Sequence, residues 1–587
     1  MAVRDVSDEI DPTTVSVIQH YLTAAAREMH RTLVRTAYNS IIYEILDFGI
    51  SIYDAECRLI SDSPGLAIFL GANDTGIRNG VEQIGIDAFE PGDIALLNYP
   101  YWSHAHTLDV LVFAPIFHGD SLRGFTACRA HWLDLGAKDP GYVLDSTDVH
   151  QEGVIFPGTK VYKQGEPDQE IIDLIKYNSR LPNKVIGDLN AQIAALRTGN
   201  QRVIELYERY GQSTVDHAID AILAHGEAQA EEAVRALPDG TWSATGEADP
   251  VAGVDQPITI DVTVTIDGSS FDVDFSESAD QLELPYNDPG ASSVAKLCFK
   301  TVTTPDETTN AGHYAPLSVT TREGSIFEPT YPAPTFVGWT GILAVDVVYQ
   351  ALADAMPELV SASSGGDLCS IMFFGHDDTT DRGFVEANND GVGWGATHDH
   401  DGQNALMHIT ETMVRNIPIE VFEHRAPVRI ERLALREDSG GHGRYRGGLG
   451  IRRDYRVTDE IGALSIVQKT RSAGWGIDGG QPGVKNVVVL DVADDGPIQV
   501  LVDNADLYGK EGHVGMMRGA FQSGDLISNR SGGGGGVGEP FNRDAKAVLQ
   551  DVIDGYVSRD GAREAYGVII TPDYEIDWGG TRRQRDV

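Results

Sequence analysis

The strongest constraint on the fold of this chain is a change in hydrophobic period near residue 240. Between residues 168 and 237 the apolar residues recur at helical spacing, whereas residues 258–266 alternate between apolar and polar side chains, as a strand does. Strand-rich sequence with frequent glycine follows from about residue 428. At about 150 residues per domain, a length of 587 residues suggests three or four domains. The sequence therefore predicts a multi-domain α+β fold.

We expect this fold to divide into four regions. The first, residues 1–240, is an N-terminal α/β domain with a candidate metal-binding hairpin and a helical segment. A mixed α/β middle domain covers residues 241–427, and a glycine-rich β domain covers residues 428–541. Residues 542–587 form a C-terminal helix and tail.

Local signals place the individual elements. Asp11 and Pro12 open a first helix reaching about residue 38, because aspartate is a good N-cap and proline suits the first helical position. Residues 108–117 and 122–132 should pair as a β-hairpin around Gly119 and Asp120. The other predicted strands are 48–53, 93–98, 429–436, 452–457, 463–468, 486–492 and 566–571, and the other predicted helices are 171–180, 187–210, 214–237, 291–301, 343–355 and 543–554.

The chain is strongly acidic, with 45 basic and 88 acidic side chains and a net charge of −43. This balance excludes a general nucleic-acid binder, because clustered Lys and Arg supply most affinity for phosphate backbones. Salt relieves the repulsion among so many acids, since the screening length falls to about 3 Å at 1 M. We therefore hypothesise a halophilic protein from a salty cell interior, with a merely acidic enzyme as the alternative.

Two further observations concern the cellular setting. Residues 1–12 lack the apolar stretch of a secretory signal, and no apolar run approaches the ~18 residues that span a membrane. The four cysteines stand far apart without a C-x-x-C pair, which argues against a disulfide scaffold or a cysteine-based zinc site. We expect a cytoplasmic protein with no membrane partner.

The cluster most suggestive of chemistry is His106, Asp109 and His131. Neutral imidazoles and a carboxylate suit Zn, Mn or Fe. A hairpin folded about Gly119 and Asp120 pairs residues whose numbers sum to about 239. Asp109 and His131 sum to 240, so they lie one position away from facing each other across the two strands. Because a one-residue slip sends paired side chains to opposite faces, the site needs a loop of three or five residues. Solvated or core histidines are the alternative interpretation.

Two other kinds of segment invite a functional interpretation. Residues 398–401 alternate histidine and aspartate, and predict either a second metal or substrate loop or simply an exposed turn. The glycine runs at 447–450 and 532–536 lack the lysine of a phosphate-binding loop and the strand–helix context of a dinucleotide site. Tight turns and close backbone approaches account better for these glycines, so we expect no cofactor-binding loop.

Several stretches of the chain, taken in order, resemble the hydantoinase B/oxoprolinase family. The ordered series is more specific than any one motif, and it spans nearly the whole chain. The stretches are residues 31–40, 46–48, 92–93 with 97–100, 106–109, 187–192, 310–312, 443–450, 532–540 and 543–569.

The resemblance implies one subunit of a pair. The partner in this family, a hydantoinase A-like subunit, uses ATP to phosphorylate the carbonyl of the substrate. The activated substrate is then hydrolysed, which opens a hydantoin, 5-oxoproline or lactam ring. In the acetone and acetophenone carboxylase branch, the substrate is carboxylated instead. We therefore expect an ATP-dependent amidohydrolase subunit, with a ketone carboxylase subunit or a non-catalytic scaffold subunit as alternatives.

The resemblance also assigns a metal site. In acetone carboxylase-like members an H-x-x-D motif and a later histidine hold manganese, and these positions match His106, Asp109 and His131 here. We expect a divalent metal at this site, with Asp134 as a hydrogen-bond acceptor that orients one imidazole.

Four other residues complete the predicted site. Asp47, or Glu44 beside it, is the expected general base, on the family resemblance. Asp188 and Gln192 lie four residues apart on one helix face and are placed to orient a substrate amide. A simple helix-surface hydrogen bond is the alternative for that pair.

Overall fold

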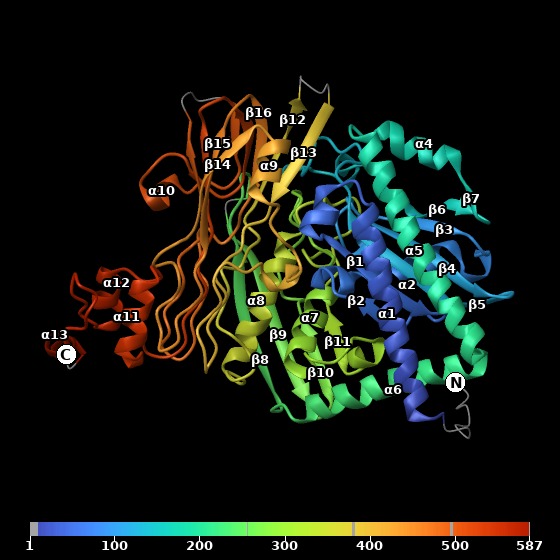
Figure 1. Ribbon diagram of the computed structural model, residues 1–587, viewed down its shortest axis with the longest axis horizontal. Helices are drawn as coiled ribbons and strands as arrows, with labels where there is room; N and C mark the ends of the chain where they lie inside the picture. The colour runs from blue at the N-terminus through green and yellow to red at the C-terminus, as the bar shows by residue number, and fades with distance from the viewer. Residues whose placement is uncertain (1–9, 255, 378–381, 493–496, 586–587) are drawn as a thin grey trace.

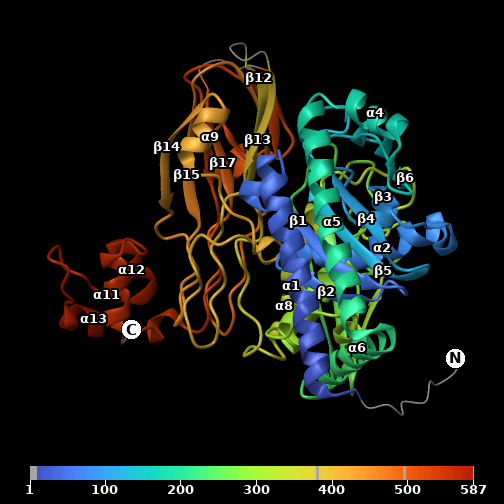
Figure 2. The same ribbon diagram turned by 45° about the vertical axis from the view of Figure 1, so that its right-hand side comes forward.

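The computed structural model describes residues 10–254, 256–377, 382–492 and 497–585. It confirms the predicted α+β class, with long helices, four sheets and a small C-terminal group of helices. Figures 1 and 2 show the N-terminal sheet and its helices on one side, two strand-rich layers on the other, and the C-terminal helices set apart at one end. In the described part of the chain, no helix is long and apolar enough to cross a membrane.

Helices cover the N-terminal sheet. The first helix, α1, begins where the Asp11 side chain accepts a hydrogen bond from the Thr14 amide, as predicted, and it packs along α5. Helix α5 starts with Pro182 in its first turn, at the predicted break between two helices. The helices of this region are α1 (Pro12–Thr36), α2 (Ala67–Ile84), α3 (Pro100–Ser103), α4 (Gln169–Asn178), α5 (Pro182–Tyr210) and α6 (Gln212–Arg235).

Helix α2 was not expected from the sequence, because three glycines weaken its helical signal. The structure explains them by close packing. A Cβ on Gly71 would lie 2.9 Å from the Cα of Ser293, and one on Gly80 would lie 2.9 Å from the Phe113 ring. These glycines therefore let the helix lie directly against α7 and β4.

The N-terminal sheet has seven strands in the order β2-β1-β5-β4-β3-β6-β7. Strands β4 and β5 form the predicted hairpin at its centre, and most of their side chains are buried. The strands are β1 (Phe48–Asp54), β2 (Leu59–Ser63), β3 (Ile94–Leu97), β4 (Asp109–His118), β5 (Ser121–His131), β6 (Pro157–Lys163) and β7 (Glu166–Pro167).

A four-stranded sheet follows the change of hydrophobic period. Along β9 the buried and half-buried residues alternate, as predicted, and the buried face packs on α8. Helix α8 is buried almost all round, which explains its nearly continuous apolar sequence. The elements are β8 (Gly240–Ala248), β9 (Ile258–Asp267), β10 (Ser270–Asp274), β11 (Leu317–Thr320), α7 (Ala291–Thr303) and α8 (Trp339–Ala353).

Two five-stranded sheets, β13-β12-β16-β20-β18 and β14-β15-β21-β17-β19, make up the strand-rich region. Strands β12 and β13 come from the segment expected in the middle domain, yet β12 pairs with β16. The elements are β12 (Ser370–Asp377), β13 (Arg382–Asn388), α9 (Ile419–Arg425), β14 (Val428–Leu435), β15 (Ile451–Val457), β16 (Ile461–Ile466), β17 (Val487–Asp491), β18 (Ile498–Val500), α10 (Ala505–Tyr508), β19 (His513–Val514), β20 (Met517–Phe521) and β21 (Leu526–Arg530).

Glycine-rich segments run side by side beneath these sheets, with backbone packed on backbone (Figure 1). Gly534 donates to the carbonyl of Gly448 at 3.0 Å and accepts from the amide of Gly441 at 2.8 Å. A Cβ on Gly393 would lie 1.9 Å from the Gly448 carbonyl oxygen. The glycine runs therefore serve close backbone approach, as predicted, because no side chain fits between these segments.

The C-terminal helices have a small hydrophobic core of their own, which includes Val548 and Tyr566. The helix expected at 543–554 is α11 (Ala545–Ile553), and α12 (Arg559–Tyr566) and α13 (Trp578–Arg585) follow it. The strand expected at 566–571 is wrong: α12 ends at Tyr566, and Ile570 makes only an isolated bridge to Ile576. This short apolar run fills a helical core instead of joining a sheet.

Candidate metal centre

The register of the β4–β5 hairpin places Asp109 directly opposite His131. The turn itself has only two residues, Gly119 and Asp120, so the predicted loop of three or five residues is wrong. A bulge corrects the register instead. Phe117 pairs with Leu122 but Ile116 pairs with Gly124, which leaves Arg123 as the extra residue.

The bulge needs a glycine where β1 approaches β5. Gly124 has φ +156°, and a Cβ there would lie 2.0 Å from the Tyr53 carbonyl oxygen. The glycine lets β1 pair with β5 up to Asp54. One inserted residue and one glycine thus set the side-chain faces at the far end of the hairpin, where the two potential ligands lie.

The structure brings His106, Asp109 and His131 together. The Nδ1 atom of His131 lies 3.0 Å from Oδ1 of Asp109, and Nδ1 of His106 lies 3.3 Å from Oδ2 of the same carboxylate. One ligand atom from each residue lies within 4.8 Å of the other two. His106 lies beside these two residues because a tight turn precedes β4, in which the amide of Asp109 donates to the carbonyl of His106.

Tyr142 orients the first imidazole. Its hydroxyl oxygen lies 3.1 Å from Nε2 of His106, which leaves Nδ1 of that ring facing Asp109. The Tyr142 ring also stacks on His131, with centroids 5.7 Å apart. Burial lowers the pKa of His106 to about 4, so this imidazole is neutral and able to ligate a metal.

Asp134 does not take the orienting part expected of it. Its carboxylate accepts hydrogen bonds from the amide of Gly136 and from the guanidinium and amide of Arg180. The side chain therefore ties the segment after β5 to the loop before α5. Asp134 follows His131 by only three residues, but it lies beyond the end of β5 and its carboxylate contacts Gly136 and Arg180 and not an imidazole.

Asp47 reaches the same site from another element. It follows a π-helical turn, Ile41–Ile45, and Leu46, which has φ +70°. The amide of Asp47 bonds to Ile41, and its carbonyl accepts the amide of His131 at 3.3 Å. Single π-helical turns are frequent at functional sites, because they re-aim the next side chain. Glu44 lies within the turn and does not line the cavity that contains Asp47, His106, Asp109 and His131, so Asp47 is the better candidate of the two.

Glu411 is a further acidic residue at this site, and sequence reasoning missed it. It comes from a 3₁₀ turn, Ile409–Glu411, about 300 residues from the hairpin, with no local motif to mark it. Burial, with the nearby charges of Asp47 and Asp109, raises its pKa well above the usual range. Burial likewise raises the pKa of Asp47 to about 7. Three carboxylates thus share one buried region.

The site has the chemistry of a cation site. Asp47 Oδ1 and Glu411 Oε2 are buried without a hydrogen-bond partner, and His106 Nδ1, although it lies 3.3 Å from Asp109, makes no hydrogen bond. Such orphaned atoms are costly unless something neutralises and binds them. Two imidazoles and a carboxylate fit a divalent transition metal, and His106, Asp109 and His131 are the residues that would hold it. Within the described ranges they are the one cluster with this geometry.

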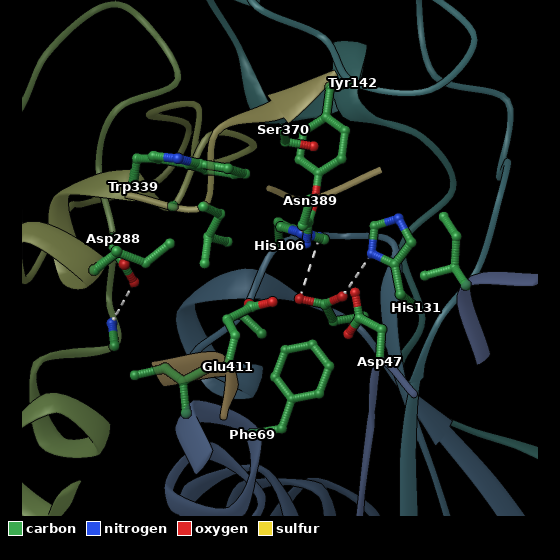
Figure 3. A pocket seen from close by; sticks show the side chains of 18 of the residues that line it. Asp47, Phe69, His106, His131, Tyr142, Asp288, Trp339, Ser370, Asn389 and Glu411 are labelled. Carbon is green, nitrogen blue, oxygen red and sulfur yellow. Dashed lines mark hydrogen bonds and ion pairs between the residues drawn. The ribbon is translucent and has the colours of Figure 1, made fainter. Parts of the chain in front are cut away.

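These residues line a cavity of about 90 Å³ (Figure 3). The figure shows the carboxylates of Asp47 and Glu411 near the two histidines, with Trp339 and Asp288 on the opposite side. The cavity lies where the N-terminal sheet, helix α8 and strand β12 meet, since all three contribute lining residues.

Asp188 and Gln192 lie on a buried face of α5, where both make hydrogen bonds to the scaffold around the hairpin. Asp188 Oδ1 accepts the amides of Tyr38 and Asn39, and the Asn39 side chain in turn donates to the carbonyl of His131. Gln192 bonds to Trp132 and to two carbonyls of the hairpin. Neither residue lines the cavity, so the predicted substrate-binding role stays a prediction.

The alternating stretch at 398–401 is an exposed turn and not a second metal loop. His398, Asp399 and His400 are exposed. Asp401 pairs with Arg543 at 2.6 Å and joins the glycine-rich region to the C-terminal helices.

Comparison with known proteins places this architecture. A family model described as hydantoinase B/oxoprolinase matches residues 11–540. The chain belongs to this family. It is 33% identical to the B-type subunit of a putative D-/L-hydantoinase from Pseudomonas sp. (strain NS671), over 99% of this chain and 98% of that protein.

Two solved structures share the family fold. The ATP-dependent caprolactamase from Pseudomonas jessenii superposes with a TM-score of 0.87 at 27% identity, covering 99% of this chain and 100% of that chain. A nucleotide-free acetone carboxylase superposes with a TM-score of 0.86 at 20% identity, covering 98% of this chain and 82% of the other. At that identity, the second likeness concerns the fold alone.

Metal analysis tests the triad. We expect the purified chain to hold about one equivalent of a transition metal by inductively coupled plasma mass spectrometry. We expect His106→Ala to lose at least nine-tenths of it, because two ligands rarely hold such an ion. The exposed His217 on α6 gives the control His217→Ala, which should keep the metal. A wild-type chain without metal, or full metal in His106→Ala, contradicts the assignment.

The buried Asp188 gives a pH-dependent test of the scaffold assignment. Burial raises its pKa from 3.8 to about 7, so the folded chain binds more protons than the unfolded chain between these values. Its contribution to stability therefore falls as pH rises from about 4 to 7. Asp188→Asn should be as stable as wild type near pH 4.5 and more stable at pH 8, by up to about 4 kcal/mol in urea unfolding.

The exposed Asp87→Asn is the control for that comparison and should show no such pH-dependent difference. Asp188→Asn should also keep substrate turnover, since the side chain does not reach the cavity. Lost turnover in a stable variant would instead favour the substrate-binding role.

Proposed function

We propose that this chain is the B-type subunit of an ATP-dependent amidohydrolase that opens a cyclic amide. The observation that carries the proposal is the buried His106–Asp109–His131 cluster beside the unpartnered carboxylate of Asp47. A putative hydantoinase subunit and an ATP-dependent caprolactamase among the relatives support the same reaction class.

The ATP site belongs on a second subunit in this proposal. The glycine runs are occupied by backbone packing, with Gly532 to Gly536 buried among other segments. A phosphate-binding loop needs exposed amides that point at the ligand, and these glycines do not supply them. A hydantoinase A-like partner, which phosphorylates the ring carbonyl, is the subunit we expect in a hetero-oligomer.

Asp47 is the general base in the proposed mechanism. His106, Asp109 and His131 would hold a divalent metal, which would supply Lewis-acid activation of an oxygen and orient water. Asp47 Oδ1 takes a proton from the water that attacks the phosphorylated ring carbon and passes it to the ring nitrogen, which leaves as an amine when the C–N bond breaks. Hydrolysis of the acyl phosphate that remains then releases the carboxylate and inorganic phosphate. His131 and Asp47 keep their relative positions through the backbone bond between them.

Reconstitution with the ATP-binding partner tests the reaction class. We expect ATP turnover that depends on a cyclic amide and not on bicarbonate, because water and not bicarbonate attacks the ring carbon. Asp47→Asn should lower turnover at least a hundredfold with its metal retained, while the exposed Asp87→Asn should have no effect. ATP turnover that needs bicarbonate assigns the ketone carboxylase reaction instead. Turnover by the partner alone assigns this chain a scaffold role.

We also propose that the protein works at high salt in the cytoplasm. The net charge of −43 makes the folded chain repel itself in dilute buffer, and screening relieves this repulsion. The thermal midpoint should rise by several degrees between 0.1 M and 2 M KCl. Full activity and an unchanged thermal midpoint in a dialysed low-salt buffer would contradict the halophilic hypothesis and favour the alternative of a merely acidic enzyme.

A further inference from the structure

Glu152 is a buried carboxylate that has no basic partner. It ends a 3₁₀ turn, Val149–Glu152, and its side chain is 0% exposed. In the part of the chain that the structure describes, its carboxylate pairs with no Lys or Arg and accepts hydrogen bonds from Ser146, Thr335 and Phe336. A buried acid is costly unless such bonds satisfy it, so these partners account for its place in the core.

The carboxylate fixes one wall of the metal cavity. Its Oε1 atom accepts the amide of Thr335 at 2.8 Å and the amide of Phe336 at 3.0 Å. Thr335 lines the cavity, and both residues are buried. Because buried amides that lose their acceptor are costly, this stretch of the wall depends on Glu152 for its position.

This wall in turn sets the plane of one metal-binding imidazole. The Phe336 ring stacks on His106, with centroids 5.5 Å apart and an angle of 13° between the planes. Tyr142 meets the Phe336 ring edge-on, and its hydroxyl lies 3.1 Å from Nε2 of His106. The two aromatic residues thus hold the imidazole with its Nδ1 atom toward Asp109.

The backbone of the same turn reaches His106 by a second route. The carbonyl of Glu152 accepts the hydroxyl of Thr107, the residue after His106, at 2.6 Å. The amide of Val149 donates to the carbonyl of Pro332 at 3.1 Å, which ties the turn to the chain just before the wall. The turn therefore joins the segment that carries His106 to the wall on which its ring stacks.

We propose that Glu152 is a positioning residue of the metal centre, which holds the His106 ring in its ligating orientation through Phe336 and Thr107. The inference rests on the proposed function, since it concerns the same metal site. Glu152 does not line the cavity, so it acts on the site only through these neighbours. Groups that orient a metal-binding imidazole typically contribute about 10- to 100-fold to metal affinity.

Hydrogen exchange in the metal-free full chain tests the contact with the wall. Glu152→Met keeps the length of the side chain and removes both acceptors, so the amides of Thr335 and Phe336 should exchange at least about tenfold faster. Burial raises the pKa of Glu152 to about 8, so glutamine resembles its uncharged form at neutral pH. Glu152→Gln keeps an oxygen for the two amides and should restore their protection. Unchanged exchange in Glu152→Met overturns the inference.

Co²⁺ binding to the full chain tests the effect on the metal site. Glu152→Met should weaken Co²⁺ binding by about 10- to 100-fold and shift its visible absorption bands, because His106 turns out of its ligating orientation. Glu152→Gln should match wild type in both. Should Glu152→Met fail to fold, Phe336→Leu removes only the stacked ring and should give the same two changes. Wild-type affinity and spectrum in Glu152→Met or in Phe336→Leu overturn the inference.

Asp93 provides a matched control. It is a buried carboxylate that accepts the amides of Glu90 and Gln164, but it lies just before β3 and does not line the cavity. Asp93→Leu should lower the thermal midpoint and leave Co²⁺ affinity and the spectrum unchanged. The same spectral change in Asp93→Leu would reflect a general loss of stability and would overturn the positioning role.

The reconstituted complex separates this inference from the function it rests on. If Glu152→Met changes the Co²⁺ spectrum as expected but the wild-type complex opens no cyclic amide, the proposed function fails and the positioning role stands. If the complex opens a cyclic amide and Glu152→Met keeps the wild-type spectrum, the function stands and the positioning role is wrong. A wild-type chain that binds no Co²⁺ overturns the inference together with the metal site.

Discussion

The cross-strand pair of Asp109 and His131 is the contact on which the rest of the site depends. Opposed side chains on neighbouring strands lie about 5 Å apart, which one metal ion can bridge. The bulge at Arg123 creates this pair, because a regular two-residue hairpin would turn the two residues to opposite faces. The tight turn before β4 then places His106 beside this pair, and the backbone hydrogen bond from His131 to Asp47 places Asp47 there.

The surrounding scaffold keeps this end of the hairpin rigid. Gln192 bonds to carbonyls of both β4 and β5, and Asp188 reaches His131 through Asn39. Such buried polar side chains stabilise only when their partners are in place. Asp188 and Gln192 on α5 therefore position the hairpin, and the residues that face the cavity are left for the chemistry.

The sequence was informative where the signal is local. The cap at Asp11, the alternation along β9 and the hairpin were all readable, because each depends on neighbouring residues. It was misleading where tertiary packing decides. The three glycines of α2 weaken its helical signal, so the helix was not predicted. The bulge at Arg123 shifts the strand register by one residue, which a count of residues from the turn could not predict. Asp134 and Asp188 are acids near the right place that serve other partners, and Glu411 arrives from a distant turn that no pattern marks.

The glycine-rich core bears on how the molecule can be divided. Its segments bond to one another across the expected boundary at 427, since the amide of Gly393 donates to the carbonyl of Gly532 and the amide of Gly448 donates to the carbonyl of Trp394. A fragment cut there would expose amides and carbonyls whose partners lie on the other piece. Because no side chain can replace those contacts, the two halves of this region should fold only together. In-frame insertions are better placed in the exposed turn at residues 398–400, where no such backbone is buried.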